Sequence, residues 1–283
     1  MSKGTAFRAL RLLFPPFLIV SLFFPASAKA GDGAWTFLPG QTLFSPILAD
    51  PREPLIGATP LLSEKGYEDA VGGTLEILRW RSSPHTQWGW GVFAGLWTLC
   101  QYPDLTGLEA YDWYSGSYLT EKTGDLSFRL EFQDQKGDLG DALEGVQPNF
   151  VIFTRDNFNL TASLDLPPQL RLYGGGGYKV WWDDFDRGYS QVFLYTGFEA
   201  YSGPISFLGP ACRGYGAYFF KYQDLARGGT YDHSAQLGLQ WGRGPWTGGG
   251  LRLALVYYNG RSEFGTFYTD YDHHWGLSLY FDP

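Results

Sequence analysis

Residues 125–133 read DLSFRLEFQ, and the apolar and polar residues of this stretch alternate strictly. Leu126, Phe128, Leu130 and Phe132 fall on one face of an extended chain. The opposite face carries polar side chains, at Ser127, Arg129, Glu131 and Gln133. Successive side chains of a strand point to opposite faces, so the period of two predicts a β-strand with one apolar and one polar face.

The same alternation recurs toward the C-terminus. It is seen in FNLTASLDL (158–166), HSAQLGLQW (233–241), LRLALVYY (251–258) and HHWGLSLYF (273–281). Short turns rich in Gly, Pro and Ser alternate with longer polar connections between these runs. We expect about eleven strands after Gly72, many of about ten residues, which is the length that a tilted strand needs to cross a bilayer.

The composition narrows the class of β protein. Aromatic residues make up 18% of the chain and there are 38 glycines, while the mean hydropathy is −0.20. A soluble sandwich would bury many Trp and Tyr groups that need internal hydrogen-bond partners, and a lipocalin-type barrel closes with about eight strands. The sequence therefore favours an all-β, up-and-down antiparallel transmembrane β-barrel of about 12 strands. Aromatic residues near strand ends are expected to form its interfacial girdles, at Trp80, Tyr118, Tyr178, Trp181, Trp182, Tyr201, Tyr222, Trp241 and Tyr257.

Residues 1–30 have the pattern of a signal peptide, with basic residues, an apolar stretch and small residues at the end. We therefore expect export, cleavage and insertion into the outer membrane of a Gram-negative bacterium. The expected partners are outer-membrane lipid and, during biogenesis, the barrel assembly machinery. A net charge of −8 argues against a nucleic-acid partner. Cys100 and Cys212 could pair in an oxidising compartment, but their expected places, at the end of one strand and inside another, favour two unpaired thiols.

Residues 43–62, LFSPILADPREPLIGATPLL, do not read as an ordinary element. If long loops face outward, strand parity requires one more strand before Gly72, and REPLIGATPLL (52–62) is the available segment. This strand gives an even total, as bacterial barrels require. We therefore divide the mature chain into a periplasmic lead-in, 31–52, and an outer-membrane barrel, 53–283. We then expect a seating role, in which contacts fix the position of the chain where it enters the wall, for Asp50, Pro51 and Arg52.

Three segments, LFSPILADPREP, LRLYGGGGY and YYNGRSEFGTFY, carry a resemblance to a bacterial family labelled domain of unknown function 1207. The resemblance covers nearly the whole mature chain. It implies an envelope β-barrel and no established activity. The chain departs from the family pattern in FQDQKGDLGDAL, where Leu139, Gly140 and Asp141 match but His and Ser are replaced in the positions around Gln135 to Asp138.

The polar strand faces carry eight charged residues that we expect to line the lumen: Arg129, Glu131, Arg155, Asp165, Arg171, Lys179, Glu199 and Arg252. Two interpretations follow. The side chains either fill and stiffen a narrow interior through ion pairs, or form a charged constriction that selects solutes. The first is favoured because a barrel of about twelve strands is smaller than the 16–18-stranded porins.

The strongest candidates for catalysis are His233, Ser234 and His274. Neighbouring residues of a strand point to opposite faces, so His233 cannot serve Ser234, and a histidine of another strand would be needed. Polar residues at a loop base are the simpler interpretation. The glycines of YGGGGY (173–178) are followed by more strand, which excludes a phosphate-binding loop, and the acidic stretch WDDFDRGY (182–189) lacks the spacing of a calcium loop.

We therefore expect no catalytic site, cofactor or metal, and the ligand is unknown. The leading hypothesis is an outer-membrane barrel with a structural role or a narrow solute passage. The alternatives are a lipid-modifying outer-membrane hydrolase and a soluble periplasmic all-β binding protein. Each hypothesis has its own observable property: conductance for a passage, lipid turnover for a hydrolase and independence of detergent for a soluble protein.

Overall fold

The computed structural model describes residues 34–62, 66–101, 107–141, 143, 153–182, 191–223, 229–242 and 250–282. The expected signal peptide and the acidic stretch 183–189 lie outside these ranges. Strands occupy most of the described chain, and their bounds are β1 Ala34–Phe37, β2 Ile56–Leu61, β3 Gly66–Arg81, β4 Thr86–Gln101, β5 Leu108–Thr123, β6 Leu126–Leu139, β7 Phe153–Leu166, β8 Leu170–Trp182, β9 Val192–Pro204, β10 Cys212–Gln223, β11 Thr230–Gly242, β12 Gly250–Arg261 and β13 Tyr271–Asp282. Two short 3-10 helices are η2, Ser206–Leu208, and η4, Gly265–Phe267.

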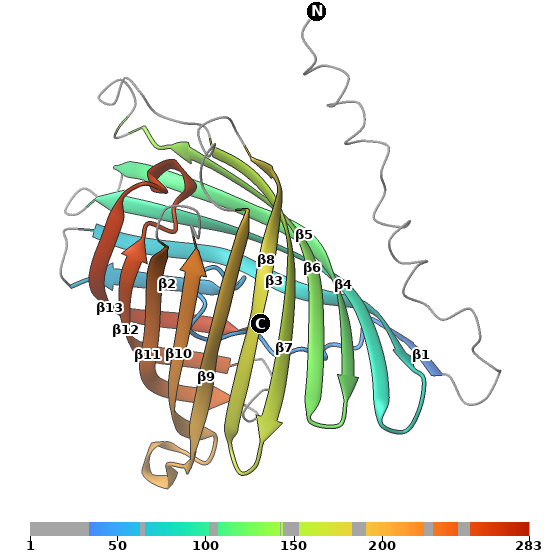
Figure 1. Ribbon diagram of the computed structural model, residues 1–283. Helices are drawn as coiled ribbons and strands as arrows, with labels where there is room; N and C mark the ends of the chain where they lie inside the picture. Colours follow the sequence, from blue (N-terminus) through green and yellow to red (C-terminus); the bar gives the residue numbers. More distant parts are fainter. Residues whose placement is uncertain are drawn as a thin grey trace, which may run out of the picture.

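Twelve of the described strands, β2–β13, form a closed antiparallel ring (Figure 1). Each strand pairs with its sequence neighbour, and β13 closes the ring on β2 through Leu279↔Ala58 and Phe281↔Ile56. The prediction of an up-and-down barrel with about 12 strands is confirmed. The upstream strand required by parity is β2, and it begins at Ile56 rather than within residues 52–55.

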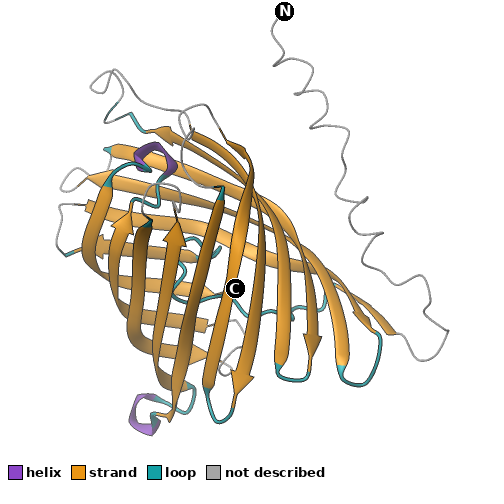
Figure 2. Ribbon diagram, viewed as in Figure 1, coloured by secondary structure: helices purple, strands orange, loops and turns teal. Residues whose placement is uncertain are grey.

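The short strand β1 lies outside this ring and was not predicted. It pairs with the end of β3, from Ala34↔Arg81 to Phe37↔Leu78, while β2 covers the beginning of the same strand. The chain between β1 and β2 leaves the sheet and crosses the interior of the barrel (Figure 2). No helix in the described ranges is long and apolar enough to cross a membrane.

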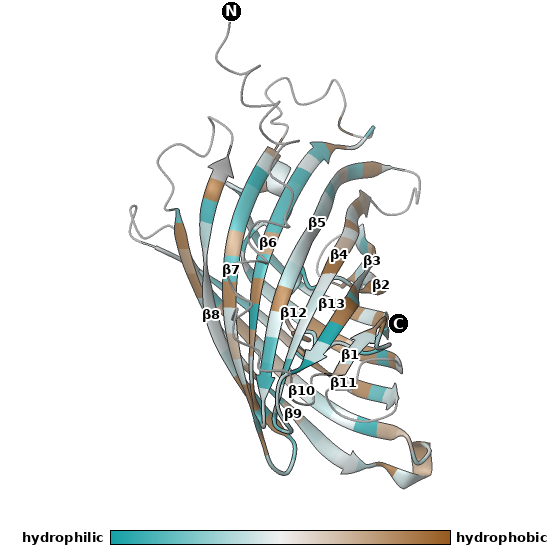
Figure 3. Cartoon of the chain, turned by 90° about the vertical axis from the view of Figure 1, so that its right-hand side faces the viewer, coloured by the Kyte–Doolittle hydropathy of each residue, from teal (hydrophilic) through white to brown (hydrophobic). Residues whose placement is uncertain are grey.

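The pattern of burial is inverted relative to a soluble protein. Figure 3 shows hydrophilic and hydrophobic residues in bands along the strands. On β6, Ser127 and Arg129 are buried, while Leu126 and Phe128 are exposed. The outward faces of β11–β13 present a continuous apolar surface that includes Leu237, Leu253, Leu255, Leu277 and Leu279. A polar interior with an apolar exterior is the arrangement that a strand needs between lipid and an internal lumen.

Two of the expected girdle residues point the other way. Tyr118 is 2% exposed and Tyr201 packs against Tyr215 at 5.8 Å, so both rings lie inside the barrel. The prediction was wrong for these two residues because a position near a strand end does not determine whether the side chain faces lipid or the lumen. Glycines on the inner face make room for such rings: a Cβ at Gly175 or Gly177 would meet the ring of Tyr195 or Phe193.

Candidate functional site

Residues 43–55, which we call the plug, fill the lumen and are the candidate functional site. Phe44, Ile47 and Ala49 are at most 2% exposed, although none of them belongs to a strand. The plug includes the last part of the segment expected as a periplasmic lead-in and the first residues of the expected barrel domain. The first strand of the wall begins at Ile56, and the plug lies inside the barrel, while the periplasmic location of the lead-in stays a prediction.

An ion pair fixes the end of the plug that is nearest β2. Arg129 of β6 donates from both terminal nitrogens to Glu53, with Nη1–Oε1 of 2.7 Å and Nη2–Oε2 of 3.0 Å. Both side chains are less than 10% exposed. The same guanidinium lies 3.1 Å from Glu131 through Nε. Two-pronged Arg–carboxylate pairs fix orientation as well as distance, so this contact sets the position of the plug.

Charged side chains of the wall also form hydrogen bonds with the backbone of the plug. Arg171 of β8 donates to the carbonyl oxygens of Ser45 at 2.8 Å and Pro46 at 2.9 Å. Glu199 of β9 accepts from the Leu48 N–H at 2.7 Å and from Arg171 at 3.2 Å. A segment without a strand partner must satisfy its backbone groups elsewhere, and charged side chains of the wall do so here.

Rings from the wall pack around the apolar residues of the plug. The Phe44 ring lies between the guanidinium groups of Arg129, at 4.6 Å, and Arg171, at 4.9 Å. Inward-facing aromatic side chains share the same buried cluster: Trp97, Tyr114, Tyr173, Tyr215, Phe219 and Tyr280. Cavities remain beside the plug among the described residues, and two of them, of about 70 and 80 Å³, have room for a few water molecules.

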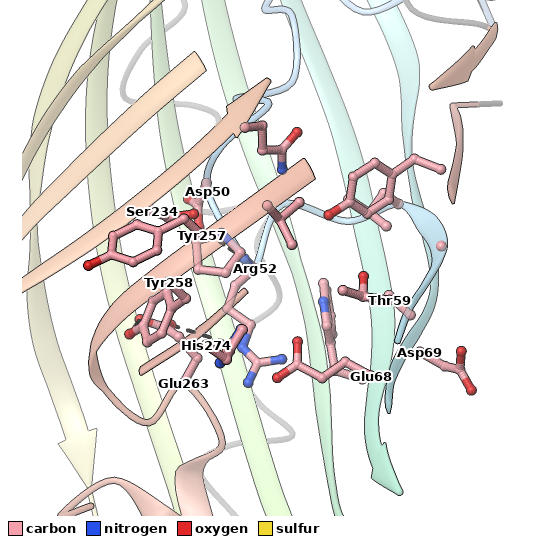
Figure 4. Close-up of a pocket in the computed structure, with 18 of the residues that line it drawn as sticks. Asp50, Arg52, Thr59, Glu68, Asp69, Ser234, Tyr257, Tyr258, Glu263 and His274 are labelled. Atoms are coloured by element: carbon pink, nitrogen blue, oxygen red, sulfur yellow. Dashed lines mark hydrogen bonds and ion pairs between the residues drawn. The ribbon is translucent and has the colours of Figure 1, made fainter. Parts of the chain in front are cut away.

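A second segment enters the lumen from the opposite end. Residues 262–270 join β12 to β13, and we call them the inner loop. The Gly265 N–H donates to Asp112 at 2.9 Å, and the buried Phe264 ring lies 4.3 Å from the Arg52 guanidinium. Glu263 lies 4.0 Å from Arg52 and 3.2 Å from Lys221. The plug and the inner loop therefore meet at Arg52 (Figure 4).

Asp50 and Glu263, the two carboxyl groups near this meeting point, have pKa values that are shifted in opposite directions. Burial raises the pKa of Asp50 to about 7, and the nearby Glu53 carboxylate adds to the rise. The Asp50 side chain accepts a hydrogen bond from the Arg52 N–H at 3.0 Å, within its own turn. Burial alone would also raise the pKa of Glu263, but Lys221 and Arg52 hold it below its usual value.

The expected seating residues Asp50, Pro51 and Arg52 therefore lie in a turn inside the lumen, against β4, β5 and the inner loop. The seating role itself stays a prediction. The eight expected lumen residues all lie on the inward face of the wall. Three of them have further partners: Arg155 donates to Gln135, Asp165 pairs with Lys122 and Arg252 pairs with Asp282. Lys179 lines a cavity.

The three candidates for catalysis are not brought together as a Ser–His pair. His233 faces outward and hydrogen-bonds Tyr218 at 2.6 Å, whereas Ser234 and His274 face the lumen. Register places Tyr258 between them, opposite Ser234 on one side and His274 on the other. Two strand spacings separate the pair by about 10 Å, which is too far for a direct hydrogen bond.

Cys100 and Cys212 are buried and free. No group of three or more His, Cys, Asp or Glu side chains among the described residues is arranged to hold a metal ion.

Sequence reasoning missed Glu53, Phe44 and the backbone contacts of the plug. A usable signal was present: Leu43, Phe44, Ile47 and Leu48 form an apolar group that a water-exposed lead-in has no reason to carry. The partner Arg129 lies 76 residues away, so no local pattern connects it to Glu53.

A closed barrel with an apolar outer face, a polar lumen and a lumenal segment of its own chain defines the class: an outer-membrane-type β-barrel with an internal plug. The family model described as protein of unknown function (DUF1207) matches residues 27–282. The chain belongs to that family, as the early resemblance indicated.

Three solved structures are similar to this chain. The outer membrane phospholipase A from Escherichia coli has a TM-score of 0.49 and 13% identity, covering 81% of this chain and 94% of that one. A variant of OccD1 (OprD) scores 0.30 with 11% identity, covering 80% and 67%. Pseudomonas aeruginosa OccK11 (OpdR) scores 0.31 with 11% identity, covering 77% of each chain. No curated protein matches the sequence.

Proposed function

We propose that this chain is an outer-membrane barrel of a Gram-negative bacterium and that it enters the outer membrane after its signal peptide is cleaved. The barrel acts as a narrow solute passage that is gated by its own plug. The observation that carries the proposal is the plug itself. Residues 43–55 occupy a lumen lined by charged side chains, and the wall holds them through Arg129, Arg171 and Glu199. With the plug in this position, the proposed passage is closed.

The chemistry of the contacts supports a movable plug. A buried ion pair gains little net free energy when both partners can be hydrated after separation. Withdrawal of the plug would admit water to Arg129 and Arg171, so both guanidinium groups would be hydrated. The apolar residues of the plug would lose their contacts with the rings of the wall on withdrawal, so we expect the open state to be rare.

Planar-bilayer recording on the refolded full-length mature chain tests the gate. We expect rare openings of the natural protein and a clear increase in open time for Arg129→Gln, which removes the two-pronged contact to Glu53. Lys136→Gln is the matched control because it removes a positive charge from the same strand, on an exposed side chain away from the plug. Silence of all three proteins at every voltage and pH would leave only a structural role.

Membrane residence has its own test. We expect the natural chain to fractionate with the outer membrane, to require detergent for extraction and to migrate differently on gels with and without heating. A chain recovered in the soluble periplasmic fraction would overturn the barrel proposal and return the soluble binding protein as the explanation.

A further inference from the structure

The cavity of about 70 Å³ beside the plug has a lining that is rich in carboxyl groups (Figure 4). We call it the acidic cavity. Arg52 is the one Lys or Arg side chain among the described residues that line it. The carboxyl groups of the lining belong to Asp50, Glu68, Asp69, Glu263 and Asp272. What the cavity can bind depends on which of these groups already have partners.

Two of the carboxyl groups are not neutralised by an ion pair. Glu263 lies 3.2 Å from Lys221 and 4.0 Å from Arg52, so its charge is already shared between two cations. Glu68 and Asp272 take part in no ion pair among the described residues. Since Glu263 already faces Arg52, these two carboxylates leave the cavity with an excess of negative charge. Such a space attracts a cation and repels an anion.

Two uncharged polar groups supply an independent indication of a ligand. Ser234 of β11 and His274 of β13 line the acidic cavity and are each 7% exposed (Figure 4). Neither the hydroxyl nor the imidazole has a hydrogen-bond partner among the described residues. The His274 ring stacks on Tyr258 at 5.5 Å, which fixes its position. Buried polar groups are normally hydrogen-bonded, so these two are suited to a ligand that donates hydrogen bonds.

The register of the barrel brings these groups into one patch of the wall. Tyr258 of β12 lies opposite Ser234 on one side and His274 on the other. Asp272 precedes His274 by two residues on β13, and residues two apart share a face of a strand. A small ligand beside Tyr258 therefore lies within reach of a hydroxyl, an imidazole and a carboxylate that come from two different strands.

Aromatic rings of the same lining are compatible with a positive charge. The Arg52 guanidinium lies 5.6 Å from the centre of the Trp97 ring, and the Arg252 guanidinium lies 4.7 Å from that of Tyr280. Both rings line the acidic cavity. The negative face of an aromatic ring attracts cations, so the rings and the unpaired carboxylates favour the same charge of ligand.

We propose that the acidic cavity binds the ammonium group of a small organic amine. The inference deepens the proposed function, on which it rests, by assigning the charge class of the solute. Asp272 and Glu68 supply the opposing charge. Ser234 and His274 accept hydrogen bonds, and an ammonium group carries three donors and no acceptor. A volume of about 70 Å³ admits a group of a few heavy atoms, so a larger amine places only its ammonium end there.

Saturation-transfer NMR on the refolded full-length mature chain in detergent, with methylammonium as the probe, tests the site. We expect saturable binding to the natural chain. Asp272→Asn should weaken it by about tenfold or more, because a charged hydrogen bond is lost. Ser234→Ala removes a neutral acceptor and should weaken it by about twofold to tenfold. Asp125→Asn makes the same chemical change in the exposed turn between β5 and β6, outside the cavity, and should bind like the natural chain.

The outcomes separate this proposal from the gate. Methylammonium binding that Asp272→Asn weakens, in a chain that never conducts, supports the ammonium site and removes the passage. Openings that respond to Arg129→Gln, together with no saturable binding of methylammonium, retain the gate and overturn the ammonium site. Binding that Asp272→Asn leaves unchanged also overturns it, as does acetate binding that is equally tight or tighter. Heat-modifiable migration confirms that each variant is folded.

Discussion

At the scale of single residues, the lumen is organised by guanidinium groups that each serve several partners. Arg171 contacts Ser163, Glu199 and the plug backbone, and Arg129 contacts Glu53, Glu131 and the Phe44 ring. Such groups have low exposure and fixed geometry. Removal of one partner therefore leaves a buried charge, which costs far more than loss of an exposed pair.

This difference predicts the effect of Glu53→Ala. The change should destabilise the folded barrel by about 3–5 kcal/mol, because Arg129 is left buried with Glu131 alone. Lys122→Ala breaks the more exposed pair with Asp165, which keeps Arg171 within 4.0 Å, and should cost about 0–1 kcal/mol. Urea unfolding in detergent, followed by tryptophan fluorescence, gives both values. Equal costs for the two variants would contradict the anchoring role of Glu53.

The raised pKa of Asp50 predicts a pH dependence. The folded value is about 7 and the usual value is 3.8, so between these limits the folded chain binds the proton more tightly than the unfolded chain. The contribution of Asp50 therefore lowers stability as pH rises from 4 to 7, by up to about 1.4 kcal/mol per pH unit. It is fully unfavourable above pH 7. The neighbouring Glu53 and Glu263 carboxylates strengthen the effect and Lys221 opposes it.

Asp50→Asn tests this origin directly. The variant should have a flatter stability profile between pH 4 and 7 and should be more stable than the natural chain at pH 8. The measurement is the urea midpoint across that pH range. A natural and a variant profile that run parallel would show that Asp50 does not titrate there.

At the scale of elements, the sequence was informative about the wall and poor on the plug. Strands β6 and β7 contain the predicted segments DLSFRLEFQ and FNLTASLDL. They could be predicted because lipid-facing and lumen-facing residues alternate along a strand, and this alternation does not depend on which strands pair with it. The plug has no such period, and its fold depends on distant residues such as Arg171 and Glu199. Strand β1 was missed because four residues are too few for a period to be read.

The attachment of the plug can be measured as an element. Hydrogen exchange should be slow in residues 43–55 of the natural chain, since the Leu43 and Leu48 N–H groups donate to Glu76 and Glu199. Arg171→Gln should accelerate exchange in this segment by about tenfold or more while the peptides of β11 and β12 stay protected. Acceleration across the whole wall would mean that Arg171 stabilises the barrel rather than the plug.

At the scale of the whole molecule, the apolar exterior makes the strongest distinction between a membrane barrel and a soluble one. Leu237 is 69% exposed in the middle of β11, on the outward face between Gly216 and Leu255. In a bilayer this position contacts lipid, so Leu237→Arg should cost about 2–4 kcal/mol. In a soluble protein the same change places a charge in water and should alter stability by no more than about 0.5 kcal/mol.

Tyr271→Arg provides the matched control. Tyr271 is 65% exposed at the first residue of β13, where a strand leaves the membrane, and Arg should cost about 0–1 kcal/mol there. Both variants are refolded into lipid vesicles and unfolded with guanidinium. A large loss for Leu237→Arg with a small one for Tyr271→Arg maps the apolar belt onto the bilayer. Two small losses would mean that the exposed leucines do not face lipid, and the plug would then close the interior of a soluble barrel.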